Sequence, residues 1–324
     1  MREAAFIKAN KEKWQEIDNQ TENKNISADS LADNFIELTD DLSYARTFYP
    51  KSQTVRYLNQ LTGRYFLTIY KFRKREKGRF VRFWKTELPL IMYRYKKYML
   101  FSFLFFISSV LIGVFSQWQD PDFANLILGP GYVNMTVENI EKGDPMAVYK
   151  DSDEAPMLFF ISSNNLKVDI FTFISGIFGC LGTLYIILQN GIMVGVFQYF
   201  FIERGLFFES ATTIWLHGTL EMSAMIIAGG AGLILGCSLL FPGSYRRIDS
   251  LMRGGMDALK IIIALLPVTM VAAIIESYLT RYTDMPDYVN LTVIVLSGLF
   301  IIWYFFYYPF RVHKKMNKIT DGED

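Results

Sequence analysis

The sequence predicts an all-α membrane protein: a polytopic bundle of helices that span a lipid bilayer, preceded by a helical N-terminal region in the cytoplasm. Two observations lead to this fold class. Of the 324 residues, 51% are hydrophobic and 20% are charged, yet long uncharged runs alternate with segments dense in Lys, Arg, Asp and Glu. Several of these runs reach the ~20 residues that a helix needs to cross a hydrocarbon core. The composition excludes disordered and collagen-like chains, and two cysteines with two histidines are too few for a disulfide framework or a zinc finger.

Residues 1–97 form the predicted cytoplasmic region, and periodicity within it predicts two amphipathic helices. The stretch from Ser27 to Pro50 begins with a Ser/Asp capping signal and ends at a proline. Its apolar residues recur at helical spacing, as do those of a second helix from Ser52 to about Arg73. The apolar faces consist of Leu31, Phe35, Leu38, Leu42 and Ala45 in the first helix, and of Val55, Leu58, Leu61, Tyr65 and Ile69 in the second.

Residues 79–97, which we call the interfacial segment, mix aromatic with basic side chains in the sequence RFVRFWKTELPLIMYRYKK. This combination is typical of a helix that lies in the membrane interface. We expect it at the inner membrane surface, either as a helical layer packed on the ends of the spans or as part of a separate signalling domain. We do not expect nucleic-acid binding, because the basic residues directly precede a span, where the positive-inside rule already accounts for them.

Residues 98–311 form the predicted transmembrane bundle, which crosses the membrane six times. The expected spans are 99–118, 168–188, a short 191–203, 212–241, 258–278 and 288–310. The dipeptide Asn190-Gly191 is typical of a tight turn and would connect the second span to the short third one. The alternative is five crossings with a half-membrane helix over 191–203, which requires protein to cover its ends.

The distribution of charge predicts the orientation of the bundle. Residues 64–97 hold twelve Lys and Arg against two acids, whereas the outer loop 119–166 holds two Lys against eight acids. Because loops rich in Lys and Arg stay in the cytoplasm, we expect both termini, the basic loop after Phe241 and a tail over 312–324 to lie inside. The charged opening of the chain predicts no signal peptide. We expect the outer loop to form a small cap with a short helix from Thr136 to Glu141.

Polar side chains inside the apolar runs are the candidate functional residues, because burying them at membrane depth is costly. His217 and Glu221 are four residues apart and share one helix face. Glu276 lies near the outer end of another span, and Asn164 and Asn165 enter the second span from outside. The predicted topology puts all five in the outer half of the bilayer, so they could form one outward-facing polar cluster.

Three roles are open for this polar cluster. It could be a hydrogen-bonded network that only fixes helix register, a proton or substrate path, or a divalent-metal site. We expect no metal and no cofactor; His217, Glu221 and Glu276 would be the ligands if a metal were bound. We also expect no catalytic residue, because His217-x-x-x-Glu221 differs from the His-Glu-x-x-His pattern of zinc peptidases. Cys180 and Cys237 lie in spans and are interpreted as small apolar residues.

Glycines at four-residue spacing predict close packing between helices. Gly232 and Gly236 lie four apart in one span, and Gly191 and Gly195 lie four apart in another. Small residues at this spacing let two helix backbones approach closely. We expect Gly218, in the same span as Gly232, to serve packing as well. The partner helix would belong to the same bundle or to a second copy of the chain.

Several stretches, in this order along the chain, resemble the stage II sporulation protein M family of bacterial membrane proteins. They are AAFIKANKEKWQEID, DLSYARTFYPKSQTVRYLNQL, SSNNLKVDIFTFISGIFGCLGTLYIILQNGIMVG, HGTLEMSAMIIAGGAGLILG and AAIIESYLTR. The resemblance covers most of the chain. The residues that match the family's motifs are Asn164, Asn165, Asn190, Gly191, His217, Gly218, Glu221 and Glu276.

The resemblance implies a scaffold in the bacterial cytoplasmic membrane. The namesake is the membrane member of a complex with cell-wall-degrading partners, and many relatives sit beside genes for a MoxR-type ATPase. We therefore expect a non-enzymatic scaffold of an envelope-associated complex. Its expected partners are the lipid bilayer, other envelope proteins, a MoxR-type ATPase system and a second copy of the chain. The alternative is a transporter or channel that uses the outward-facing cluster.

Overall fold

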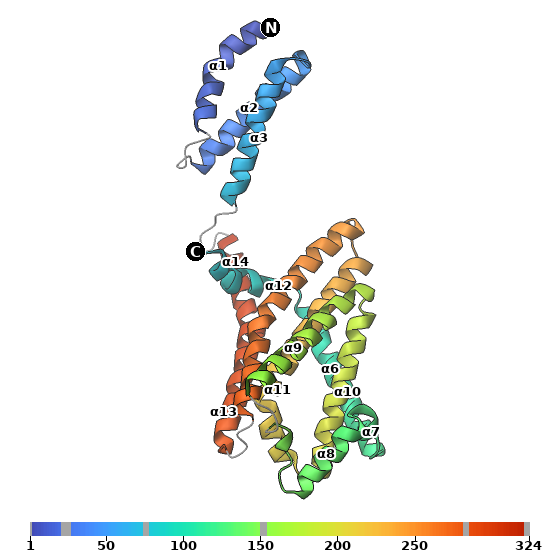
Figure 1. Cartoon of the computed structure of the whole chain (residues 1–324). Helices are drawn as coiled ribbons and strands as arrows, with labels where there is room; N and C mark the ends of the chain where they lie inside the picture. Colours follow the sequence, from blue (N-terminus) through green and yellow to red (C-terminus); the bar gives the residue numbers. More distant parts are fainter. Residues whose placement is uncertain (1, 21–26, 74–77, 150–153, 281–284, 321–324) are drawn as a thin grey trace. The chain divides into compact units, whose positions relative to one another are not determined.

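The computed structural model describes residues 2–20, 27–73, 78–149, 154–280 and 285–320, and these residues form helices and connections without a strand (Figure 1). The chain divides into two compact units, Met1–Val81 and Arg82–Asp324. Within the described ranges, six helices are long and apolar enough to cross a membrane, so the predicted all-α polytopic fold is confirmed. These spans are Lys96–Gln119, Pro156–Phe178, Leu181–Glu203, Phe207–Leu240, Arg247–Leu279 and Asp287–Lys318.

The described part of the N-terminal unit contains helices α1 (Glu3–Gln20), α2 (Ala28–Phe48) and α3 (Gln53–Arg73). The Ser27 hydroxyl accepts a hydrogen bond from the Ser30 amide and caps α2 at the predicted position. The buried core consists of Phe6, Trp14, Ile17, Leu31, Leu38, Leu42, Ala45, Leu58, Leu61 and Tyr65. It contains seven of the ten residues on the two predicted apolar faces, and the other three pack half-buried against it.

From Arg82 onward the interfacial segment belongs to the membrane unit, so the predicted boundary at residue 97 is too late. Its described elements are α4 (Arg79–Arg82), the π-helical turn η1 (Phe83–Glu87) and α5 (Leu88–Arg94). The unit boundary follows Val81, because Leu88, Ile91 and Met92 are buried in the core of the bundle. This arrangement is the helical layer that the sequence suggested. Residues 74–77, also part of the basic stretch, lie outside the described residues.

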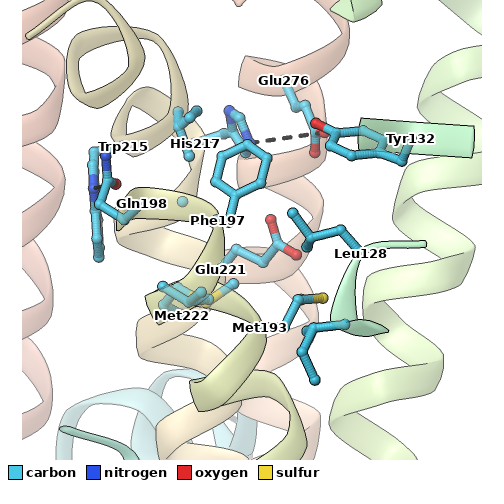
Figure 2. A pocket seen from close by; sticks show the side chains of 14 residues that line it. Leu128, Tyr132, Met193, Phe197, Gln198, Trp215, His217, Glu221, Met222 and Glu276 are labelled. Atoms are coloured by element: carbon cyan, nitrogen blue, oxygen red, sulfur yellow. Dashed lines mark hydrogen bonds and ion pairs between the residues drawn. The ribbon is translucent and has the colours of Figure 1, made fainter. Parts of the chain in front are cut away.

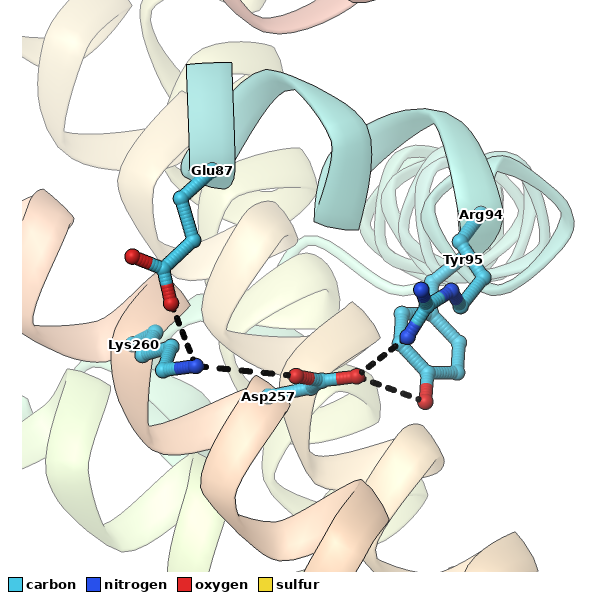
Figure 3. Close-up of polar contacts among 5 residues, drawn as sticks. All are labelled: Glu87, Arg94, Tyr95, Asp257 and Lys260. Atoms are coloured by element: carbon cyan, nitrogen blue, oxygen red, sulfur yellow. Dashed lines mark hydrogen bonds and ion pairs between the residues drawn. The ribbon is translucent and has the colours of Figure 1, made fainter. Parts of the chain in front are cut away.

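Polar contacts join the interfacial segment to α12 (Arg247–Ile274) (Figure 3). Lys260 Nζ lies 2.6 Å from Glu87 Oε1. Asp257 Oδ2 accepts hydrogen bonds from Arg94 Nη1 at 3.0 Å and from Tyr95 Oη at 3.2 Å. Burial, together with the nearby Asp257 carboxylate, raises the pKa of the Tyr95 phenol above its usual range, so this phenol remains a donor.

Helix α11 (Phe207–Leu240) is the central element of the bundle and contacts five other spans. Its neighbours are α6 (Lys96–Gln119), α9 (Glu154–Ile174), α10 (Leu181–Glu203), α12 and α13 (Asp287–Ile301). Every residue from 224 to 234 is buried. A side chain at Gly232 would overlap Thr183 and the Thr172 carbonyl, and one at Gly236 would overlap the backbone of Cys180. The small residues therefore serve close packing inside this bundle, as their spacing predicts.

The predicted turn at Asn190-Gly191 is wrong, and so are the predicted bounds of the second and third spans. Residues 181–203 form one helix of 23 residues, long enough to cross the membrane, and therefore not a half-membrane element. The break lies earlier, at η3 (Ser175–Phe178) and at Gly179 and Cys180, whose φ angles are +65° and +71°. The Asn190 amide donates to the Ile186 carbonyl within the helix.

The segment between α6 and α9 forms a cap of short helices. These are α7 (Phe123–Ile127), α8 (Pro130–Glu141) and η2 (Ala147–Tyr149). Helix α8 begins six residues before the predicted Thr136, because Pro130 occupies its first turn and Gly129, with a φ of +87°, ends the preceding loop. Helix α9 begins at Glu154, so the outer loop is shorter than the predicted 119–166. Residues 150–153 lie outside the described residues.

The C-terminal part of the bundle contains two π-helical turns. Helix α12 continues into η4 (Ile275–Leu279), and α13 continues through η5 (Ile302–Tyr307) into α14 (Tyr308–Thr320). The predicted tail from residue 312 is therefore helical up to Thr320, and residues 321–324 lie outside the described residues.

Candidate functional site

A cavity of about 370 Å³ opens between the cap and the adjoining half of the bundle (Figure 2). Its walls come from α7 and the start of α8, the second half of α10, the first half of α11, and η4. The lining residues are Ile127, Leu128, Tyr132, Met193, Val194, Phe197, Gln198, Ile214, Trp215, His217, Gly218, Glu221, Met222 and Glu276. The wall is mostly apolar with a few polar groups, which is the usual composition of a ligand-binding pocket.

His217 connects α11 to the π-helical turn that follows α12. Its side chain is buried, and its Nε2 lies 3.8 Å from Glu276 Oε1 (Figure 2). Its other ring nitrogen, Nδ1, lies 3.1 Å from Thr280 Oγ1. The two nitrogens of one imidazole thus contact two side chains from one neighbouring element, which fixes the orientation of the ring.

Glu221 lies one helical turn after His217 and faces the same cavity, as the four-residue spacing predicts. One nitrogen of His217 and one carboxylate oxygen from each of Glu221 and Glu276 all lie within 4.8 Å of one another. The structure therefore brings together the three ionisable residues of the five in the predicted cluster.

A π-helical turn presents Glu276 to the cavity. In η4 the Thr280 amide bonds to the Ile275 carbonyl, five residues earlier, at 3.0 Å. Such a turn rotates the residues that follow relative to a regular α-helix, and π-turns are frequent at functional sites. Apolar periodicity contains no signal for a single wide turn, which is why Thr280 was not among the predicted site residues.

Asp169 on α9 is a buried carboxyl next to the cluster. The sequence marks it as a polar residue at the start of the second span, but the predicted cluster did not include it. Its Oδ2 accepts a hydrogen bond of 2.7 Å from Thr269 on α12, and its carboxyl lies within electrostatic range of Glu221. A charged residue inside an apolar run is the sequence signal that identifies it. Thr269 has no such signal, since threonine is common in helical spans.

The structure does not place the two predicted asparagines in the cavity wall. Asn164 is exposed, and Asn165 is buried on α9. Among the described residues, no partner accepts a hydrogen bond from the Asn165 amide nitrogen. Gly218 also differs from its predicted packing role, because a Cβ there would have only Ile214 nearby, at 3.9 Å, and its open side faces the cavity.

Further polar groups line the cavity and were not predicted. Trp215 Nε1 donates to Gln198 Oε1 at 3.0 Å, and Gln198 Nε2 donates to Ser210 Oγ at 3.2 Å. Tyr132 reaches the wall from α8 (Figure 2). Burial raises the pKa of the Tyr132 phenol above its usual range, so it is a neutral donor at the cavity.

The electrostatics of this site favour a bound cation or proton. Glu276 lies within electrostatic range of Glu221, which in turn lies near Asp169. Like charges repel strongly where the surroundings are poorly polarisable, and three neighbouring carboxylates would be costly without a compensating charge. The cluster can therefore exchange protons, or bind a metal or a cationic ligand. It can also remain a purely structural network in which some of the carboxyl groups stay protonated.

The comparison with protein families covers both units. A family model described as Stage II sporulation protein M matches residues 102–281, which is more than half of the chain. The chain belongs to the stage II sporulation protein M family. The matched region contains His217, Glu221 and Glu276, and family membership together with the six apolar spans identifies a multi-pass integral membrane protein.

A second family model, described as Domain of unknown function (DUF8413), matches residues 4–71. This range coincides with the three helices of the N-terminal unit. No curated protein and no solved structure matches the chain. In this member of the stage II sporulation protein M family, a separate helical unit therefore precedes the family's membrane region.

Proposed function

We propose that the chain is a non-enzymatic scaffold of the bacterial cytoplasmic membrane that holds partner proteins of an envelope-associated complex. The observation that carries this proposal is the division of the chain into a helical unit with its own core and a membrane bundle. A unit with its own core, joined in one chain to a membrane anchor, is suited to binding a partner at the membrane surface. The membership of the stage II sporulation protein M family supports the same role.

The packing of α11 supports an anchor rather than a conduit. A passage through the bundle would run along α11 between residues 224 and 236, where Gly229 contacts Ile187 and Gly230 contacts Met99. Gly232 is packed equally tightly against α9 and α10. At such contacts the helices leave no room for water or a solute.

The charge distribution supports an orientation with both termini in the cytoplasm. Six spans put the two termini on the same side, and the basic stretch 64–97, the loop with Arg246 and Arg247, and the basic C-terminal helix share that side. A cysteine introduced at Ser244 should resist a membrane-impermeant thiol reagent in intact cells, and one at Asp120 should react. The reverse pattern would refute this orientation.

Affinity purification after cross-linking in cells tests the scaffold. We expect the full chain to capture a cytoplasmic partner, with a MoxR-type ATPase as the first candidate, and a variant lacking residues 2–73 to insert normally and lose it. A variant lacking residues 136–150 should keep that partner and lose extracytoplasmic ones. Each deletion is the control for the other, and capture that neither deletion changes would contradict the proposal.

A transporter or channel is the second candidate, and the cavity is the observation that favours it. The cavity contains ionisable groups and lies beside the acidic cap, as an outward-facing substrate site would. Purified protein in liposomes should be assayed for proton and Zn²⁺ flux, with Gly218→Leu as a variant in which the new side chain fills the cavity. Flux that this variant abolishes would favour transport, and no flux above that of protein-free liposomes would favour the scaffold.

A further inference from the structure

We infer that His217, Glu221 and Glu276 form a binding site for one divalent transition-metal ion, of the Zn²⁺ or Mn²⁺ class, in the wall of the cavity. The site goes beyond the scaffold role and does not depend on it. Its evidence is the spacing of the three side chains, the hydrogen bond behind His217 and the charge of the two carboxylates.

The spacing of the ligand atoms is close to that of a metal site. Ligand atoms bind Zn²⁺ at about 2.0–2.2 Å, so two of them on one ion are at most roughly 4.4 Å apart. His217 Nε2 and Glu276 Oε1, at 3.8 Å, already meet this limit, and all three ligand atoms lie within 4.8 Å. A small rotation of the Glu221 side chain, which borders the cavity, brings the set into range.

The hydrogen bond to Thr280 prepares His217 for a metal. The Thr280 hydroxyl lies 3.3 Å from the Ile275 carbonyl, to which it can donate, and 3.1 Å from His217 Nδ1. In the tautomer with the proton on Nδ1, this hydroxyl accepts from His217, and the lone pair of Nε2 is on the side of Glu276, where the metal would be bound. Metal-binding imidazoles are commonly oriented by such a second hydrogen bond.

The charge and chemistry of the ligands select the type of ion. Two carboxylates and one neutral imidazole carry a charge of minus two, which a divalent cation neutralises, and a neutral assembly is the least costly one at membrane depth. Imidazole nitrogen suits Zn²⁺ and carboxylate oxygen suits Mn²⁺, so a mixed set of ligands can bind either, whereas Mg²⁺ and Ca²⁺ prefer oxygen ligands throughout. The cavity of about 370 Å³ leaves room for water or a ligand group to complete the coordination.

Equilibrium metal binding to the full chain tests this inference. Protein purified in detergent is stripped with a chelator, equilibrated with Zn²⁺ or Mn²⁺, desalted, and measured for bound metal per chain. Co²⁺ absorption reports the ligand geometry independently. We expect one ion per chain, a loss of affinity of at least about tenfold in Glu221→Gln and Glu276→Gln, and a change in the Co²⁺ spectrum in both.

Matched controls separate this site from surface binding and from misfolding. Glu209→Gln changes an exposed glutamate on the same helix and should leave the metal content unchanged. Thr280→Val keeps all three ligands, removes only the support behind His217, and should weaken binding by roughly 10–100-fold, as is typical for such supporting groups. If Glu276→Gln does not elute as a folded protein in gel filtration, the metal affinity of Thr280→Val tests the inference in its place.

Three results would overturn the inference: no stoichiometric Zn²⁺ or Mn²⁺ in the unmodified chain, binding that the two Glu→Gln variants retain, or Mg²⁺ bound as tightly as Zn²⁺. Partner capture by the variant lacking residues 2–73 measures the scaffold role separately. The metal site can therefore fail while the scaffold stands, and the scaffold can fail while the metal site stands.

Discussion

The two halves of α11 illustrate opposite uses of one helix. From residue 224 to residue 234 every side chain is buried, and glycines bring neighbouring backbones into contact. From Ile214 to Met222 the same helix lines a cavity and presents His217 and Glu221 to it. The closely packed half of α11 thus supports the half that lines the cavity. A binding site needs such a base, because its side chains must keep their geometry when the cavity is empty.

The largest effect is expected from one substitution made in each half. Gly232→Leu inserts a side chain where a Cβ alone would overlap Thr183 and the Thr172 carbonyl. Overpacking a core usually costs about 1–3 kcal/mol, and a Leu forced against the Thr172 carbonyl and the Thr183 side chain exceeds that range, so we expect no folded protein in gel filtration. Gly218→Leu projects into the cavity and should fold and melt like the parent. Equal behaviour of the two variants would refute the contrast between the halves.

The second prediction concerns the cavity half alone. If a metal binds the folded chain, Zn²⁺ at about 100 times its dissociation constant should stabilise the protein by roughly 2.7 kcal/mol, measured by thermal unfolding in detergent. Glu276→Gln should lose most of this shift, whereas Glu209→Gln should retain it. Glu276→Gln without metal should be at least as stable as the parent, because it removes one of two neighbouring carboxylates. A parent protein whose stability is unaffected by Zn²⁺ would contradict the prediction.

A smaller effect is expected at the contact between α9 and α12, beside the cluster. Thr269 donates a 2.7 Å hydrogen bond to Asp169, and both side chains are buried. Thr269→Val removes the donor with little change in shape and should destabilise the protein by about 1 kcal/mol, the net value of a typical hydrogen bond. Thr269→Ser keeps the hydroxyl and is the matched control. If Val and Ser lower the melting temperature equally, packing at this position matters and the hydrogen bond does not.

The sequence predicts the membrane fold well because each span has to cover a fixed thickness of hydrocarbon. The number of spans can be predicted from the lengths of the apolar runs alone. The positions of the helix ends cannot be predicted in this way. The break near Gly179 was missed because Asn190-Gly191 is the stronger turn signal in water. In the bundle, Gly191 instead packs against Ser109 of α6, and the helix keeps its backbone hydrogen bonds, which nothing else could supply in lipid.

The candidate site was predictable in part for a similar reason. His217, Glu221 and Glu276 stand out because ionisable residues are rare in spans, and helical spacing with topology puts them at similar depth. The cavity was not predictable, because its wall includes α8 and Gly218, and the sequence gives no sign of how the cap folds back. Asn165 shares the polar signal, yet the rotation of α9 places it outside the cavity wall. Periodicity does not determine that rotation.

The smallest effect is expected where the bundle meets water, at the ion pair between Lys260 and Glu87. These side chains are 31% and 37% exposed, so the pair is partly solvated despite its distance of 2.6 Å. Partly exposed pairs contribute about 0.2–1 kcal/mol. A double-mutant cycle with Lys260→Met and Glu87→Gln should give a coupling energy in that range at low salt. In 1 M salt, where the screening length falls to about 3 Å, the coupling should be nearly absent. A larger, salt-independent coupling would mean that the interfacial segment is shielded from water as fully as the packed half of α11.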